Sequence, residues 1–120
     1  MSDCVLAIDL GTSGPKVAVV TLDAEVLGWQ TRGTKLALHD GGGAEQDPHD
    51  WWQAIVAAAR AVLEQTGAAE RIAAVAVTSQ WGGTVLVDEQ GEPLRPAIIW
   101  MDCRGAPPVS RIQRLSLRAP

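Results

Sequence analysis

A carboxylate and a turn of small, hydroxyl-bearing residues stand together near the start of the chain, in the order Asp9-Leu-Gly-Thr-Ser13. Asp9 ends a short apolar run, and open α/β sheets bind their ligands at the carboxyl ends of such buried strands. Gly11 lets backbone approach a phosphate, Thr12 and Ser13 add hydroxyl and N–H donors, and Lys16 adds a nearby cation. Asp9 also suits Mg²⁺, which takes one or two carboxylates and fills its shell with water and phosphate. The stretch therefore predicts a magnesium–phosphate site.

The alternative for this stretch is purely structural: Asp9 closes an Asx turn after a strand. The chain has no GxxxxGK[ST] loop and no GxGxxG, so neither common glycine-rich phosphate motif supports the first interpretation. From these residues alone both interpretations stand.

Apolar patterning predicts a mixed α/β sheet that would position the turn. Asp47 as cap, Pro48 at the first position and Gly67 as stop predict one long helix over 48–66. Its apolar face is expected to carry Trp52, Ile55, Val56, Ala59, Val62 and Leu63. Residues 32–46 show no clear periodicity and are expected to form a loop. Strands are expected near 5–9, 16–21, 25–31, 72–77, 84–87 and 94–99.

Composition limits the possible partners. The 120 residues suit one domain and carry a net charge of −4, which argues against nucleic acid or an anionic membrane as partner. Residues 105–120 hold three Arg and no acid, so the residues before them carry −7 of that total. The two cysteines, Cys4 and Cys103, are far apart and form no disulfide framework, and no signal or membrane segment is recognised, so a cytoplasmic protein is expected.

Four motifs in order resemble the FGGY carbohydrate kinases, a branch of the actin-like ATPase superfamily, with xylulokinase-like members the most similar. They are Ile8–Gly14, Ala44–Pro48 leading into Trp51-Trp52, Val77–Val85 and Pro96–Arg104. The resemblance implies a ribonuclease H-like (actin-like ATPase) fold, here a partial amino-terminal domain over 1–104. It also implies ATP-dependent phosphorylation of a sugar or polyol hydroxyl, with ATP and Mg²⁺ as cofactors.

By that resemblance, Asp9 helps to position Mg-ATP, and Gly11, Thr12 and Ser13 contact the phosphates. His39 and His49 lie without partners at metal-ligand spacing, so neither is assigned to a metal.

The resemblance places the sugar beside the loop after the strand that ends at Val77, which assigns substrate contacts to Gln80, Trp81 and Gly82. Many xylulose kinases carry His at the position of Gly82, so the sugar stays open. Trp81 either stacks on a sugar ring or anchors the core. Asp102 either contacts substrate or forms a structural ion pair with Arg104.

The same resemblance puts the catalytic Asp and the second domain beyond residue 120, so this chain is expected to be inactive alone and to contain no catalytic residue. Residues 105–120 are expected to be a divergent basic tail without order, and the full-length protein could form a homodimer. The non-enzyme alternative is a truncated half-domain that binds phosphate weakly or not at all. An aspartic protease, suggested by Asp9-Leu-Gly-Thr12, conflicts with the long helix and the absence of a second Asp-Thr/Ser-Gly.

Overall fold

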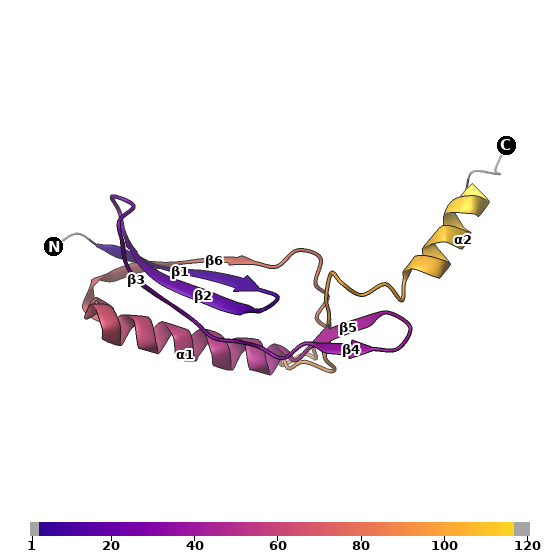
Figure 1. Cartoon of the computed structure of the whole chain (residues 1–120), viewed down its shortest axis with the longest axis horizontal. Helices are drawn as coiled ribbons and strands as arrows, with labels where there is room; N and C mark the ends of the chain where they lie inside the picture. The colour runs from indigo at the N-terminus through magenta and orange to yellow at the C-terminus, as the bar shows by residue number, and fades with distance from the viewer. Residues whose placement is uncertain (1–2, 117–120) are drawn as a thin grey trace.

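The computed structural model describes residues 3–116. Its main element is a four-stranded sheet, to which the first three strands of the chain belong. The strands of this sheet are β1 (Cys4–Gly11), β2 (Gly14–Thr21), β3 (Val26–Thr31) and β6 (Ile72–Ser79), in the order β3-β2-β1-β6. The first three pair antiparallel, and β6 runs parallel to β1 (Figure 1). The predicted mixed sheet is confirmed.

The β1–β2 hairpin closes tightly, because Gly11 and Gly14 are cross-strand partners with only two residues between them. Gly14 has φ +128°, and a Cβ there would lie 1.9 Å from the carbonyl oxygen of Arg32. Only glycine fits this position, so the turn is held against the start of the segment that follows β3.

The long helix α1 spans Pro48–Thr66, as predicted. The Asp47 side chain accepts a hydrogen bond from the His49 amide at 2.9 Å, Pro48 opens the helix, and Gly67 ends it in the left-handed conformation at φ 61°. The Gly67 amide donates to the Leu63 carbonyl at 2.9 Å.

The hydrophobic core lies between α1 and the sheet, with α1 packed mainly on β2 and β3. The helix contributes a narrow stripe of small residues at four-residue spacing, and Trp52 is 67% exposed, so its predicted place on the apolar face is wrong. Trp52 precedes Ala54 by two residues, which turns it roughly 200° around the helix from the buried stripe. The core residues are Cys4, Leu6, Val17, Val19, Ala58, Val62 and Ala68.

A second, smaller sheet forms beyond the start of α1, where the sequence predicted a loop. It contains β4 (Ala37–His39), β5 (Gly43–Gln46) and β7 (Ala97–Ile98), all antiparallel. Gly41 and Gly42 turn the β4–β5 hairpin with φ of 79° and 86°. β4 and β5, of three and four residues, are too short to show a period, which is why the pattern predicted a loop there.

The predicted strand over 84–87 is wrong. Only two isolated bridges form there, Thr84 with Ile98 and Val87 with Pro93. Proline lacks an N–H, so Pro93 and Pro96 prevent a continuous ladder, and the predicted strand over 94–99 shortens to β7.

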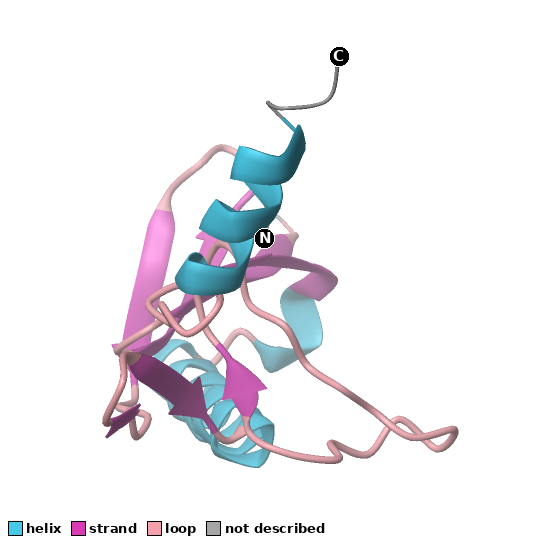
Figure 2. Ribbon diagram, turned by 90° about the vertical axis from the view of Figure 1, so that its right-hand side faces the viewer, coloured by secondary structure: helices cyan, strands magenta, loops and turns pink. Residues whose placement is uncertain are grey.

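The end of the chain differs from the tail expected without order. A helix, α2, spans Ala106–Ser116 after β7 and projects away from the rest of the fold (Figures 1 and 2). A short 3₁₀ turn, η1 (Ala69–Arg71), lies earlier in the chain, between α1 and β6. Two prolines near the beginning of α2 do not prevent this helix, because the first turn of a helix needs no amide donors. Residues 117–120 of the expected tail lie outside the described residues. Among the helices of residues 3–116, none is long and apolar enough to cross a membrane.

Candidate functional site

Thr12, in the β1–β2 turn, joins three parts of the fold. Its hydroxyl donates to Gln80 Oε1 at 2.9 Å and accepts from the indole Nε1 of Trp100 at 2.9 Å. Its carbonyl oxygen accepts from Gln46 Nε2 at 2.9 Å. The predicted phosphate turn and the predicted sugar loop are therefore in direct contact through this side chain.

Gln46 connects the turn to the rest of the network from β5. It is 2% exposed, and its Nε2 also lies 3.2 Å from Thr34 Oγ1 and 3.1 Å from the Lys35 carbonyl oxygen. Its Oε1 accepts from Gln80 Nε2 at 3.0 Å. The backbone N–H of Gln80 donates to the Leu10 carbonyl oxygen at 2.7 Å. One buried glutamine thus fixes the second glutamine at the end of β6.

The sequence placed Gln46 in the loop expected over 32–46 and assigned no role to Trp100. Gln46 stands directly before the cap residue Asp47, where a polar residue is unremarkable, so the sequence carries no signal for its burial. Trp100 was noted only as part of the Pro96–Arg104 motif. The contacts of both residues with Thr12 form only when the β1–β2 turn, β5 and the segment after β7 meet in the fold.

Asp9 lies on the sheet beside this network and pairs with Lys16 across β1 and β2. Asp9 Oδ2 is 3.8 Å from Lys16 Nζ, and the two side chains are 49% and 70% exposed. Both line a hollow of about 500 Å³ over the sheet face turned away from α1, together with Ala7, Ala18 and Trp29. A solvent-accessible carboxylate beside a cation can take part in binding a magnesium–phosphate group.

The turn residues suit a close approach of phosphate. A Cβ on Gly11 would meet only the Gly14 carbonyl oxygen, at 3.5 Å, and Ser13 is exposed. Within residues 3–116, no three His, Cys, Asp or Glu side chains gather as a metal cage. Mg²⁺ does not require one, because it binds through one or two carboxylates together with phosphate and water.

The loop after β6 presents aromatic surface next to the hydrogen-bonded network. Trp81 is 83% exposed and Trp100 is 51% exposed. Gly82, at φ +68°, lies beside Trp100, and a Cβ there would be in ordinary van der Waals contact with the Trp100 Cβ at 3.5 Å. Trp81 therefore does not anchor the core of this chain, and its indole is open to solvent.

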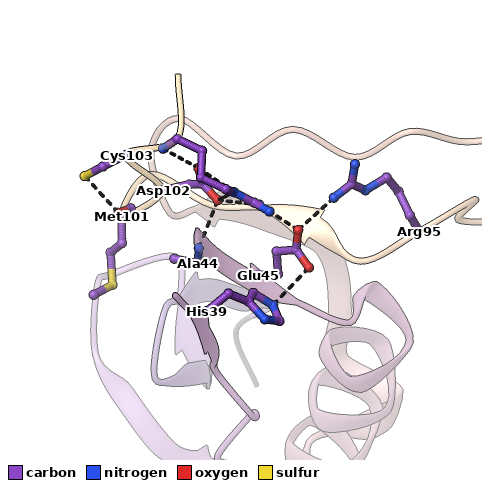
Figure 3. A network of polar contacts seen from close by, with 8 residues as sticks. His39, Ala44, Glu45, Arg95, Met101, Asp102 and Cys103 are labelled. Atoms are coloured by element: carbon purple, nitrogen blue, oxygen red, sulfur yellow. Dashed lines mark hydrogen bonds and ion pairs between the residues drawn. The ribbon is translucent and has the colours of Figure 1, made fainter. Parts of the chain in front are cut away.

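Asp102 forms a structural ion pair with Arg104, in agreement with one of its two predicted roles. Its Oδ2 also accepts from the Ala44 amide at 2.9 Å, and its side chain is only 6% exposed (Figure 3). Hydrogen bonding from Arg104, then from the Ala44 amide, holds the pKa of Asp102 well below its usual range. The direct substrate contact of Asp102 stays a prediction.

Glu45 extends this pair into a cluster that joins β5 to the segments before and after β7. It is 8% exposed, and its Oε1 lies 2.7 Å from both Arg95 and Arg104, with His39 Nε2 3.2 Å from Oε2 (Figure 3). The hydrogen bond that Arg104 donates to Glu45 lowers the pKa of Glu45, and the hydrogen bonds that Arg104 donates to Asp102 and Glu45 raise its own pKa. Because Gln46 is the next residue of β5, the cluster holds the strand that positions the network.

Comparison with known proteins identifies the family. The model of the FGGY family of carbohydrate kinases, N-terminal domain, matches residues 4–119. The chain is similar to a glycerol kinase of Gluconobacter oxydans, 37% identical over 105 residues, and to a xylulose kinase of Escherichia coli, 39% identical over 101 residues. These matches cover 87% and 84% of this chain.

Solved structures agree. The xylulose kinase of Rhodospirillum rubrum superposes with a TM-score of 0.83 at 28% identity, covering 92% of this chain and 23% of that one. The chain spans about a fifth of the length of the two curated relatives, 20% and 21%. It thus belongs to the FGGY family of carbohydrate kinases, in which it matches the N-terminal domain.

Proposed function

We propose that this chain supplies the phosphate-binding side and part of the substrate-binding side of an ATP-dependent kinase that phosphorylates a hydroxyl of a sugar or polyol. The relatives named as glycerol and xylulose kinases support this substrate class. The observation that carries the proposal is the hydrogen bond between Thr12 and Gln80, which joins the two predicted half-sites.

Phosphoryl transfer depends mainly on positioning and on charge stabilisation. Bound Mg-ATP would supply the transferable phosphate, with Asp9 and Lys16 at the metal–phosphate group and Gly11, Thr12 and Ser13 along the phosphates. These five residues belong to one hairpin, so their relative positions are set by the β1–β2 ladder.

On the substrate side, Gln80, Trp81 and Gly82 would border the sugar or polyol. Trp81 would stack on the apolar face of a ring, while Gln80 is held by Thr12 and Gln46 and keeps one fixed orientation. The exposed indole of Trp100 adds a second apolar wall next to Gly82.

We further propose that residues 1–120 alone do not turn over. A catalytic base contributes typically ~10²–10⁴-fold, and none of the assigned residues has that role. Such a kinase would work in the cytoplasm, where ATP is available, and the full-length protein could form a homodimer.

A non-catalytic half-domain is the second candidate function. The favouring observation is apolar surface left open on the sheet: Trp29 is 61% exposed and Val77 is 67% exposed. Surface of this kind in a soluble domain marks a place where another part of a protein packs.

Titration of the ¹⁵N-labelled chain with Mg²⁺ and a non-hydrolysable ATP analogue tests the phosphate half of the proposal. We expect the amide resonances of Gly11, Thr12 and Ser13 to shift, and the shifts to weaken in Asp9→Asn. The matched control is Asp23→Asn, which removes an exposed carboxylate from the β2–β3 turn. Shifts centred elsewhere, or equal effects of the two substitutions, would refute the assignment.

A further inference from the structure

The hydrogen-bonded network at the β1–β2 turn has a fixed donor-to-acceptor direction, which can be traced from Gln46. One end of the Gln46 side-chain amide lies 2.9 Å and 3.1 Å from the carbonyl oxygens of Thr12 and Lys35. Backbone carbonyl oxygens only accept hydrogen bonds, so this end is the NH₂ group and the other end is Oε1. The orientation of Gln46 is therefore set by the backbone of two separate segments.

The orientation of Gln46 determines that of Gln80. Gln46 Oε1 lies 3.0 Å from the side-chain amide of Gln80, and this oxygen can only accept, so the facing atom is Gln80 Nε2. The other end of the amide, Gln80 Oε1, then lies 2.9 Å from the Thr12 hydroxyl. Because Gln80 Oε1 carries no proton, the Thr12 hydroxyl donates to it.

Trp100 is consistent with the same direction. Its indole Nε1 is a donor only, so at 2.9 Å it donates to Thr12 Oγ1. The single hydroxyl proton of Thr12 therefore goes to Gln80. Ser13, the next residue of the turn, is exposed, and within residues 3–116 its hydroxyl has no hydrogen-bond partner. The turn thus contains one hydroxyl proton that is already used, on Thr12, and one that is available to a ligand, on Ser13.

We propose that Thr12 is a positioning residue for the substrate side: its hydroxyl holds Gln80, which leaves the second Nε2 proton of Gln80 to donate to a hydroxyl oxygen of the sugar or polyol. Gln80 is half-buried, and one of its Nε2 protons goes to Gln46. In the described part of the chain the other Nε2 proton has no acceptor. Every hydroxyl oxygen of a sugar or polyol has a lone pair that can accept it.

This inference rests on the proposed function and divides the tasks of the turn. The backbone N–H of Thr12 and the hydroxyl of Ser13 remain for the phosphates. If the Thr12 hydroxyl turned to a phosphate instead, the half-buried Gln80 Oε1 would lose its donor, and leaving such an acceptor without a partner is unfavourable. The Ser13 hydroxyl can donate to a phosphate without any such loss. Removing the Thr12 hydroxyl should therefore weaken substrate binding more than nucleotide binding.

NMR spectra of the ¹⁵N-labelled 120-residue chain test the direction of the network. Thr12→Val keeps the shape of the side chain and removes the hydroxyl, so the indole resonance of Trp100 and the side-chain amide resonances of Gln80 should shift. Thr12→Ser should return both toward their original positions. Thr66→Val is the matched control, because the Thr66 hydroxyl donates to the Val62 carbonyl oxygen at 2.8 Å within α1. Resonances of Trp100 and Gln80 that do not respond to Thr12→Val, or that respond equally to Thr66→Val, would overturn the proposal.

The unsubstituted chain provides a measurement that does not depend on a variant folding. A hydrogen-bonded, half-buried hydroxyl proton exchanges with water more slowly than an exposed one without a partner. The hydroxyl proton of Thr12 should therefore exchange more slowly than that of Ser13. Equal exchange rates at the two hydroxyls would overturn the proposal.

Two titrations of the same chain separate the substrate role of Thr12 from a phosphate role. Xylulose should shift the side-chain amide resonances of Gln80. Thr12→Val should raise the Kd for xylulose at least about tenfold more than the Kd for Mg²⁺ with a non-hydrolysable ATP analogue, on the scale of one hydrogen bond. The reverse ratio, or no effect of xylulose on Gln80, would overturn the proposal. An analogue that fails to shift the turn would contradict the phosphate site of the proposed function, whereas the Thr12→Val spectra would still decide the direction of the network.

Discussion

Replacing Gln46 with alanine should destabilise the fold by removing the hydrogen bonds that connect the turn at Thr12 to the loop at Gln80. The side chain is 2% exposed, so water does not satisfy it in the folded state. Its two N–H protons are shared among the oxygens of Thr12, Thr34 and Lys35, and its carbonyl accepts from Gln80. Three effective hydrogen bonds at ~1 kcal/mol each predict a loss of about 3 kcal/mol in the free energy of unfolding.

Urea denaturation followed by far-UV circular dichroism measures this loss. The control is Gln30→Ala, which removes two exposed hydrogen bonds, from Gln30 Nε2 to Gln65 Oε1 at 2.9 Å and from Arg32 Nη1 to Gln30 Oε1 at 3.4 Å. We expect that control to change stability by less than about 0.5 kcal/mol. If Gln46→Ala and Gln30→Ala destabilise the protein equally, the network does not support the site as described.

Three further outcomes follow from the structure. The hydrogen bond from Arg104 lowers the pKa of Asp102 in the folded state, so the stability that the Asp102 carboxylate provides is complete above its unfolded pKa of roughly 4. That stability is lost progressively as the pH falls from there toward the lower folded-state pKa. Urea midpoints measured against pH should therefore fall less steeply in acid for Asp102→Asn than for the unsubstituted chain. Gly14→Ala, whose Cβ would lie 1.9 Å from the Arg32 carbonyl oxygen, should destabilise the fold by about 3 kcal/mol, whereas Gly33→Ala, with no atom within 4 Å, should be neutral in thermal melts. Coupled-enzyme assays of residues 1–120 with Mg-ATP and glycerol or xylulose should detect no turnover, and measurable turnover would contradict the proposed need for a further catalytic base.

Local signals were sufficient to predict the elements that they control. The cap at Asp47, the proline after it and the stop at Gly67 define α1 at both ends, because capping is decided within a few residues. The central strands β1 and β2 likewise follow from continuous apolar runs. These elements place the turn after Asp9 at the end of the central strand β1. That placement is the part of the candidate site that a sequence can indicate.

The rest of the site depends on residues that are far apart in the chain. Thr12 is separated from Gln46, Gln80 and Trp100 by 34, 68 and 88 residues, and no local pattern specifies which polar side chains will meet. The short strands of the second sheet exist only because they pair with one another. Trp52 shows the same limit, since the pattern could not identify which stripe of α1 the sheet would cover.

A chimera tests the central claim most directly. Residues 1–104 of this chain would replace the matching segment of the Escherichia coli xylulose kinase, to which the chain is 39% identical over 101 residues. The proposed function predicts ATP-dependent phosphorylation of xylulose or glycerol by the folded chimera. Asp9→Asn should reduce kcat by at least ~10²-fold, as expected when a group that stabilises transferring charge is removed, while Asp23→Asn should leave it unchanged. A folded chimera that phosphorylates neither substrate, or one in which the two substitutions act alike, would contradict the assignment of the phosphate site to the turn after Asp9.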